Sequence, residues 1–284
     1  LGVAPAASDD FRLAVRVQRR ALLGSARVQA IVDAARGESD VRYIGRVEKL
    51  QGRASMRDHH RPLIVGASVG HVAITAGTLG AFVTTADGEM AILSNNHVLA
   101  DENRAEIGDA IIQPADLDDG RDPEDVVARL SDYVPIAPVA VNRVDSAVAT
   151  LVDGVDVDPV GSLGALGAGV VAPQDADRVD KLGRTTGRTT GRVSAFNVRS
   201  VIVEYDISPT VRFDGQIEIQ VDDGSEFSLG GDSGSLIVSE GNRVPVGLLF
   251  AGSDQGGPDG GAVTYANPIA EVLAALNVEL YRGS

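Results

Sequence analysis

Short apolar or alternating runs, each closed by glycine, proline or aspartate, recur through most of this 284-residue chain. One pair, at residues 81–85 and 90–94, flanks Ala-Asp-Gly, which is the signal of a β-hairpin. Many short strands with frequent turns predict an all-β barrel or sandwich. Aromatic residues make up only 4% of the chain, so small aliphatic side chains must build most of its interior. Further strands are expected at residues 193–205, 216–221, 244–250 and 262–266, with a loop at Ser208-Pro209.

The N-terminal part of the chain has a different pattern. Residues 11–18 alternate, residues 25–36 carry apolar side chains at helical spacing, and residues 41–47 alternate again. Ser25 is expected to cap the helix and Gly37 to end it. The pattern predicts a β-α-β appendage with a locally positive character. It suits homo-oligomer contacts, a partner protein or autoinhibition, and a plain structural brace is the alternative.

The bulk properties narrow the classes of partner and compartment. The formal net charge of −15 argues against nucleic acid as a partner and against anionic membranes. No uninterrupted apolar run approaches the ~20 residues of a membrane-spanning helix. Cysteine is absent, which fits a reducing compartment. We therefore expect a cytoplasmic protein, with a removed leader as the open alternative.

The candidate chemistry centres on a serine in a glycine-flanked turn. Gly-Asp-Ser-Gly-Ser at residues 231–235 places Ser233 where backbone N–H groups can converge on the group that it attacks. His97, followed by Val-Leu, offers a base, and Asp145, followed by Ser-Ala-Val-Ala, offers a carboxylate. Each also has an ordinary interpretation, as a loop serine, a core histidine or a strand-end carboxylate. The order His, Asp, Ser is one of the known chain orders of a catalytic triad.

The three segments together resemble the motifs of trypsin-like serine proteases, which have the chymotrypsin fold. Residues 181–193 resemble the strand-turn-strand that opens the second barrel of that family. Residues 75–80 and 94–97 are most similar to its cysteine-free narrow-leaf type branch of bacteria and plants. The resemblance covers about residues 62–270. It implies an all-β protein with a double six-stranded antiparallel β-barrel. The residue pattern adds the β-α-β appendage before the barrels and a C-terminal helix at residues 268–276 after them.

The expected organisation has four parts. They are the appendage and linker at residues 1–60, a first barrel at 61–152 with His97 and Asp145, an interlobe connection at 153–178, and a second barrel at 179–284 with Ser233 and the helix.

The resemblance implies a serine endopeptidase that acts on a protein or peptide substrate and needs no cofactor or metal. Ser233 would be the nucleophile, His97 the general base, and Asp145 the group that orients the imidazole. The N–H groups of Gly231 and Ser233 would form the oxyanion hole. A latent protease-fold module for binding or scaffolding is the alternative. Another acyl hydrolase is disfavoured because the chain lacks a Gly-x-Ser-x-Gly elbow among alternating strands and helices.

Specificity is expected from residues around the primary pocket. Phe227, six residues before Ser233, stands where this family places the base of that pocket and where trypsin has an aspartate. By resemblance, Phe250 and Gly252 lie at the edge that pairs with substrate backbone, and Thr264 helps Phe227 to narrow the pocket. An aromatic ring cannot pair with a guanidinium as a carboxylate does, so small or medium apolar residues are expected rather than Arg or Lys.

Several alternatives stay open at this point. His71 is a second candidate for the base. Asp232 could pair with an N-terminal ammonium released before Ile64, although a barrel strand there is favoured. The histidines at residues 59–60 lack further ligands at metal spacing, and the acidic residues 116–125 fit a solvated loop better than a calcium site.

Overall fold

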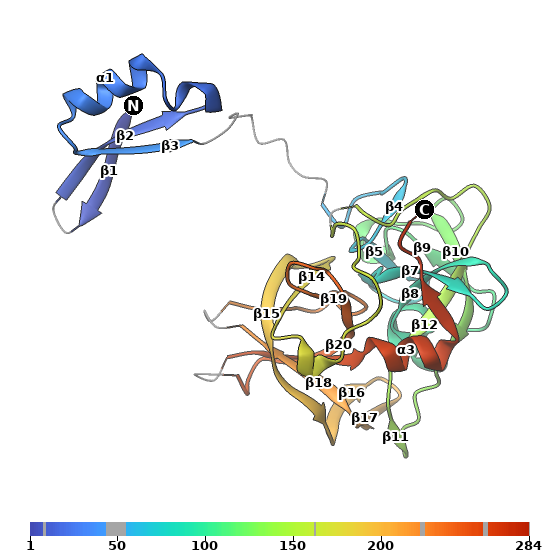
Figure 1. Cartoon of the computed structure of the whole chain (residues 1–284). Coiled ribbons are helices and arrows are strands. Elements are labelled where there is room, and N and C mark those ends of the chain that lie inside the picture. Colours follow the sequence, from blue (N-terminus) through green and yellow to red (C-terminus); the bar gives the residue numbers. More distant parts are fainter. Residues whose placement is uncertain (8–9, 44–54, 162, 222–224, 258–260, 284) are drawn as a thin grey trace. The chain divides into compact units, whose positions relative to one another are not determined.

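The computed structural model describes residues 1–283 apart from 8–9, 44–54, 162, 222–224 and 258–260. The chain divides into two compact units, Leu1–Arg53 and Ala54–Ser284 (Figure 1). The first unit is a sheet in the order β1-β2-β3, with a helix between its two parallel strands. Its elements are β1 (Gly2–Ala7), β2 (Asp10–Val17), the 3-10 turn η1 (Arg20–Leu22), α1 (Ala26–Ala34) and β3 (Ser39–Tyr43).

The predicted β-α-β pattern corresponds to β2, α1 and β3. Ser25 caps α1, because its hydroxyl accepts a hydrogen bond of 3.3 Å from the N–H of Val28. Strand β1 was not predicted, since Gly-Val-Ala-Pro-Ala-Ala has no period-two alternation. The predicted strand at residues 41–47 continues into positions 44–47, which lie outside the described residues.

The second unit begins with a curled sheet of eight strands, which forms its first lobe. These strands are largely buried, as in β8, where four successive residues are buried and both faces of the strand are therefore covered. In sheet order the strands are β22 (Val278–Leu280), β7 (Ala81–Thr85), β8 (Met90–Ser94), β12 (Ala147–Leu151), β10 (Val126–Tyr133), β9 (Ala110–Ile112), β5 (Ser68–His71) and β6 (Gly77–Thr78).

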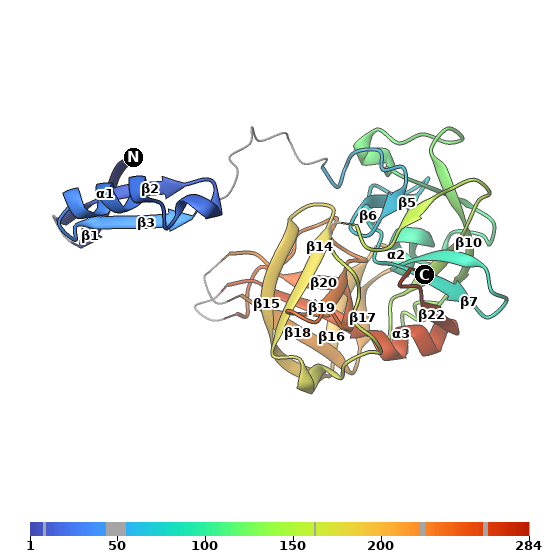
Figure 2. The same cartoon turned by 45° about the horizontal axis from the view of Figure 1, so that its top comes forward.

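The second lobe is a closed barrel of six strands (Figure 2). Its interior is filled by small and aliphatic side chains together with Phe227. Around the barrel the strands are β14 (Arg178–Gly183), β15 (Gly187–Val198), β18 (Gln216–Gln220), β21 (Val263–Pro268), β20 (Pro245–Ser253) and β19 (Leu236–Ser239). A curled sheet facing a closed barrel confirms the predicted double-barrel architecture, with the first barrel open rather than six-stranded.

A hairpin projects from the second lobe and corrects two predictions. The strand predicted at residues 193–205 is two strands, because the chain turns at Ser200, whose φ is +57°. The loop predicted at Ser208-Pro209 is the start of a strand. The hairpin comprises β16 (Val201–Tyr205) and β17 (Ser208–Phe213), and β17 pairs in parallel with β11 (Val141–Asn142).

The remaining elements are a C-terminal helix, a pair of two-residue strands and several short helices. Helix α3 (Ile269–Leu276) corresponds to the predicted C-terminal helix, and it leads the chain back to the first lobe, where β22 pairs with β7. Strand β4 (Leu63–Ile64) pairs with β13 (Val157–Asp158) outside the eight-stranded sheet. None of the helices in the described residues is long and apolar enough to cross a membrane. The other short helices are α2 (Asn96–Leu99), η2 (Asp101–Asn103), η3 (Asp116–Asp118) and η4 (Pro173–Asp175).

The largest hydrophobic core runs through both lobes. It joins first-lobe residues such as Leu93 and Leu99 to Leu236 and Leu248 of the barrel, all of which are fully buried. A smaller cluster lies beneath the projecting hairpin and consists of Ile136, Val201, Tyr205, Val211, Phe213 and Phe250. The candidate site therefore lies where two lobes share one core.

Candidate active site

His97 lies on a single helical turn that follows β8. The next two residues, Val98 and Leu99, are buried in the core, which leaves the side chain of His97 22% exposed at the surface of the turn. This arrangement follows from the sequence, because an apolar strand and two apolar residues hold the turn from both sides. The backbone of His97 is thus held by the core, while one side of its imidazole is exposed to solvent.

Asp145 is fully buried and binds this imidazole. Nδ1 of His97 donates to Oδ2 of Asp145 at 2.5 Å, while Oδ1 accepts from the backbone N–H groups of Asn96 at 2.7 Å and His97 at 3.3 Å. A hydroxyl completes the set, because Tyr205 donates to Oδ2 at 2.7 Å. Since Nδ1 carries the shared proton, Nε2 of the neutral ring is free to accept another.

The Asp145 carboxylate also favours the protonated form of His97. Burial lowers the pKa of the imidazole, but the negative charge and hydrogen bond of Asp145 outweigh it, and the pKa of His97 is raised. Glu102 contributes in the same direction. A raised pKa makes the imidazolium easier to form, which is the requirement for a base that must hold a proton temporarily.

The Ser233 turn is held against the first lobe by β6. The N–H of Thr78 donates to the carbonyl of Ser233, and its hydroxyl donates to the carbonyl of Gly231, both at 2.8 Å. Gly231 and Gly234 both have φ of +91°, which disfavours residues with a side chain.

The two lobes approach so closely here that glycine is required. A Cβ on Gly234 would lie 2.1 Å from Oγ of Ser94, and a Cβ on Gly80 would lie 2.1 Å from the carbonyl oxygen of Gly234. Ser94 ends β8, two residues before the turn that carries His97. The nucleophile candidate thus lies beside the segment that delivers the base candidate.

The structure brings His97 and Asp145 into direct contact, but Ser233 is not hydrogen-bonded to His97. Within the described part of the chain, the Ser233 hydroxyl makes no hydrogen bond to the imidazole. Catalytic hydrogen bonds are often long in unliganded enzymes and tighten when substrate binds. Ser233 is partly exposed and lines a pocket, so its hydroxyl is accessible.

Two backbone N–H groups near Ser233 are available as hydrogen-bond donors. The carbonyl of Gly230 accepts a 2.8 Å hydrogen bond from the hydroxyl of Thr185, which fixes the orientation of the Gly230–Gly231 peptide. Because a trans peptide points its N–H opposite to its C=O, the N–H of Gly231 faces away from Thr185. Among the described residues, the N–H groups of Gly231 and Ser233 have no protein acceptor. They are available to a ligand.

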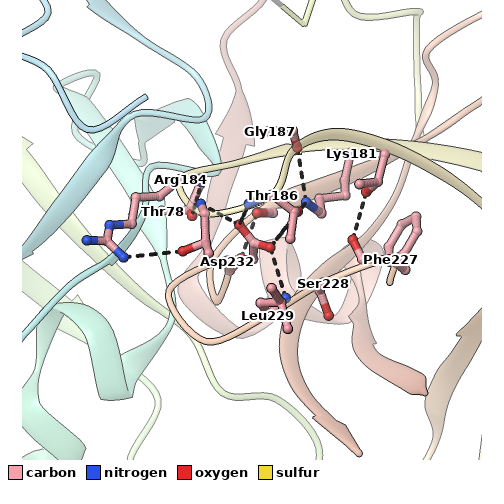
Figure 3. A network of polar contacts seen from close by, with 12 residues as sticks. Thr78, Lys181, Arg184, Thr186, Gly187, Phe227, Ser228, Leu229 and Asp232 are labelled. Carbon is pink, nitrogen blue, oxygen red and sulfur yellow. Dashed lines mark hydrogen bonds and ion pairs between the residues drawn. The ribbon is translucent and has the colours of Figure 1, made fainter. Parts of the chain in front are cut away.

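A buried ion pair stabilises this turn from inside (Figure 3). Nζ of Lys181 lies 3.3 Å from Oδ2 of Asp232, and both side chains are fully buried. Oδ1 of Asp232 accepts from the N–H groups of Thr185 and Thr186, at 2.8 and 3.1 Å. Oδ2 also accepts from the Thr186 hydroxyl at 2.7 Å and from the N–H of Leu229 at 3.0 Å.

Lys181 is held on every side. Its ammonium donates to the carbonyl of Gly187 at 3.0 Å and to the Thr186 hydroxyl, and it lies 5.9 Å from the centre of the Phe227 ring. Burial lowers the pKa of Lys181, and the negative charge of Asp232 opposes that shift. Sequence reasoning considered an N-terminal ammonium at Ile64 for this role and missed Lys181. The sequence carried no clear signal for it, because its strand segment, Arg-Val-Asp-Lys-Leu-Gly, contains other charged residues.

The acidic loop is anchored to the same region. Asp118 is only 6% exposed, and both its oxygens accept from the guanidinium of Arg184, at 2.5 and 2.7 Å. The prediction of a solvated loop is therefore wrong for Asp118. Its partner could not be identified from the sequence, because Arg184 follows 66 residues later on the other lobe.

The residues predicted for the specificity pocket have different positions. A pocket of about 300 Å³ beside Ser233 includes Gly252 in its lining. Phe227 is buried in the barrel core under Lys181, and Phe250 packs on Phe213 behind the histidine, so neither ring lines this pocket. The hydroxyl of Thr264 pairs with that of Ser228 at 2.7 Å, and Ser228 belongs to the lining.

The other histidines lie elsewhere. Nε2 of His71 is 3.1 Å from Oδ2 of Asp109, and its Nδ1 accepts from the N–H of Ala73. His59 lies 3.2 Å from Asp125, and His60 is bonded to the carbonyl of Ser55. Within the described residues, no group of three or more potential metal ligands is assembled.

Comparison with solved structures identifies the architecture. Protease A of Thermobifida fusca superposes with a TM-score of 0.53 at 16% identity, covering 78% of this chain and 98% of that one. The chain has the chymotrypsin fold. A Nocardiopsis protease gives a TM-score of 0.51 at 16% identity, over 76% of this chain and 97% of that one. A Cellulomonas bogoriensis chymotrypsin gives 0.51 at 18%, over 78% and 98%.

The chymotrypsin fold confirms the resemblance that the three motifs indicated. No protein-family model matches the chain, and no curated protein matches it either. The assignment to the narrow-leaf type branch stays a prediction. At these identities the comparison establishes the fold, and any conclusion about activity must come from the site.

Proposed function

We propose that this protein is a serine endopeptidase that hydrolyses protein or peptide substrates through an acyl-enzyme. The observation that carries the proposal is the buried hydrogen bond between Asp145 and Nδ1 of His97, beside a turn that presents Ser233. A carboxylate in this position fixes the tautomer in which Nε2 is the base. The neighbouring N–H groups of Gly231 and Ser233 supply donors for a developing oxyanion.

The reaction proceeds in two halves. Oγ of Ser233 attacks the carbonyl carbon of the peptide bond while Nε2 of His97 takes the hydroxyl proton, and the carbonyl electron pair moves to oxygen. The imidazolium then protonates the leaving amine as the C–N bond breaks, which leaves an acyl ester on Ser233. In the second half, water attacks the acyl carbon while Nε2 of His97 takes its proton. The imidazolium then returns a proton to Oγ of Ser233 as the ester bond breaks, and the acid is released. Asp145 stabilises the imidazolium in both halves.

A serine-directed probe tests the proposal. The full chain is incubated with a fluorophosphonate, and the adduct is located by peptide mass spectrometry, with unfolded protein as the control. We expect stoichiometric labelling of Ser233 and loss of peptide hydrolysis in proportion to labelling. A chain that stays unlabelled would instead be a latent module for binding or scaffolding. A labelled chain that hydrolyses esters but not peptides would be another acyl hydrolase.

The pocket beside Ser233 predicts which residue precedes the cleaved bond. Leu249, Ala251 and Val263 line it together with Gly252, so we expect small or medium apolar side chains to be preferred. Glu226 and Asp254 also belong to the lining but are exposed to solvent. A peptide library sequenced after partial digestion measures the preference. Strict cleavage after Arg or Lys would contradict it and would direct attention to these two carboxylates.

A further inference from the structure

Tyr205 reaches the catalytic carboxylate from outside the histidine segment. It ends β16 on the projecting hairpin, is 7% exposed, and donates its hydroxyl to Oδ2 of Asp145 at 2.7 Å. The same oxygen accepts the Nδ1 proton of His97. The hydroxyl therefore acts on the atom that orients the base.

The hydrogen-bond donors to the Asp145 carboxylate come from two separate segments of the chain. Oδ1 receives two backbone N–H groups, and Oδ2 receives Nδ1, all from Asn96 and His97. Among the side-chain donors that the structure describes, Tyr205 is the one supplied by the second lobe. Without its hydroxyl, one lone pair of a fully buried carboxylate would lose its donor, which is costly in a dry environment.

Aromatic packing fixes the Tyr205 ring. Its centre lies 6.0 Å from that of Phe213, which lies 4.8 Å from Phe250. On its other side, the ring meets His97 at 5.9 Å in a T-shaped contact with planes at 73°. These contacts leave the phenol little rotational freedom, so its hydroxyl is held in place before substrate arrives.

The tip of the hairpin is fixed by Glu102. Its carboxylate accepts from the N–H groups of Asp206 and Ile207, at 3.1 and 2.9 Å. Glu102 is in the left-handed region, with φ +53° and ψ +49°, as are its neighbours Asp101 and Asn103. Left-handed backbone is unfavourable for a residue with a side chain, so the surrounding contacts must hold this loop in place.

Asn103 connects that loop to the histidine turn. Its side-chain oxygen accepts from the amide of Asn96, and its own N–H donates to the side-chain oxygen of Asn96. The loop thus links the residue beside His97 to the tip that follows Tyr205.

We propose that Tyr205 is a positioning residue of the active site, which orients Asp145 and delocalises its charge through the phenol hydroxyl. The hairpin β16–β17 is then a functional part of the site. Burial and the charge of Asp145 raise the pKa of Tyr205 well above its usual value, so the hydroxyl keeps its proton over the working range. The expected change in kcat/KM rests on the proposed function. The expected change in the pKa of His97 does not.

The variant Tyr205→Phe tests it in the full chain. Removal of a hydrogen bond to a buried charge should lower kcat/KM by about tenfold to a hundredfold. Loss of the donor leaves more negative charge on Oδ2, which favours the imidazolium, so the pKa of His97 should rise. The other charged group acting on His97 is Glu102, which is unchanged in the variant. The acid limb of kcat/KM should therefore move to higher pH.

Two control variants separate this role from a structural one. Tyr265→Phe removes a phenol that donates to Glu218 at 3.2 Å, and it should change neither kcat/KM nor the His97 titration. Phe213→Leu disturbs the packing of Tyr205 but keeps the hydroxyl, so it should lower thermal stability without raising the pKa of His97. All measurements are made below the unfolding transition of each variant.

NMR titration of His97 supplies a readout that does not need activity. A higher His97 pKa in Tyr205→Phe supports the inference even in a chain that hydrolyses no peptide, a result that would defeat only the proposed function. An unchanged His97 pKa in folded Tyr205→Phe overturns the inference. Equal shifts in Tyr205→Phe and Phe213→Leu also overturn it, because packing alone would then explain them.

Discussion

Replacement of Ser233 by alanine should reduce peptide hydrolysis by about a millionfold, the loss typical of removing a triad nucleophile. The hydroxyl makes no hydrogen bond to His97 here, and the backbone of Ser233 stays held by Thr78. The variant should therefore fold normally and unfold at an unchanged temperature. Initial rates on a fluorogenic peptide, together with thermal unfolding, measure both expectations.

Ser239→Ala is the matched control for the nucleophile. Its hydroxyl accepts from the N–H of Val244 at 3.0 Å at the end of β19, so its loss should leave turnover intact. Fluorophosphonate labelling should persist in this control and vanish in Ser233→Ala. Undiminished hydrolysis by folded Ser233→Ala would refute the proposed mechanism.

The second large effect is expected at the buried ion pair. Lys181→Met leaves the fully buried Asp232 without its cation, and breaking such a pair typically costs 3–5 kcal/mol. Asp232 lies between the two amides assigned to the oxyanion hole, so the turn should lose its geometry as well. We expect a lower midpoint in urea unfolding and a loss of kcat greater than the loss of substrate binding.

The double variant Lys181→Met with Asp232→Asn separates charge from packing. With both charges removed, the free energy of unfolding should recover in part, because the amide oxygen can still accept from the N–H groups of Thr185 and Thr186 while its NH2 group faces the N–H of Leu229. Equal stability of Lys181→Met and the unmodified chain would contradict the assigned role of the ammonium.

The same pair bears on how the site becomes active. Ile64 lies in β4 and pairs with Asp158 of β13, and Lys181 already supplies the cation that Asp232 would receive from a new N-terminus at Ile64. Active protein should therefore retain the residues before Ile64 when its N-terminus is sequenced.

Local patterns were enough to predict much of the fold. The hairpin of β7 and β8 follows from two mainly apolar runs on either side of an Ala-Asp-Gly turn, and α3 follows from apolar residues at helical spacing. The motif around Ser233 was recognisable because its glycines must adopt backbone conformations that other residues avoid. These features depend on neighbours in the sequence, which a single chain displays directly.

Contacts between distant segments were not accessible in this way. Tyr205 lies 60 residues from Asp145 in the sequence, and Lys181 lies 51 residues from Asp232. Phe227 shows the same limit, because its position in the motif suggested the pocket whereas its ring packs in the barrel core. In each case the direction of a side chain decides its role, and that direction depends on three-dimensional packing.

The glycine contact between the lobes limits how this molecule can move. Neither Gly80 nor Gly234 leaves room for even a methyl group, and the backbone of one directly meets the backbone of the other. Sliding one lobe past the other at this point would force main-chain atoms into each other, so this contact resists shear between the lobes. A survey of all substitutions at these two positions should find glycine alone tolerated.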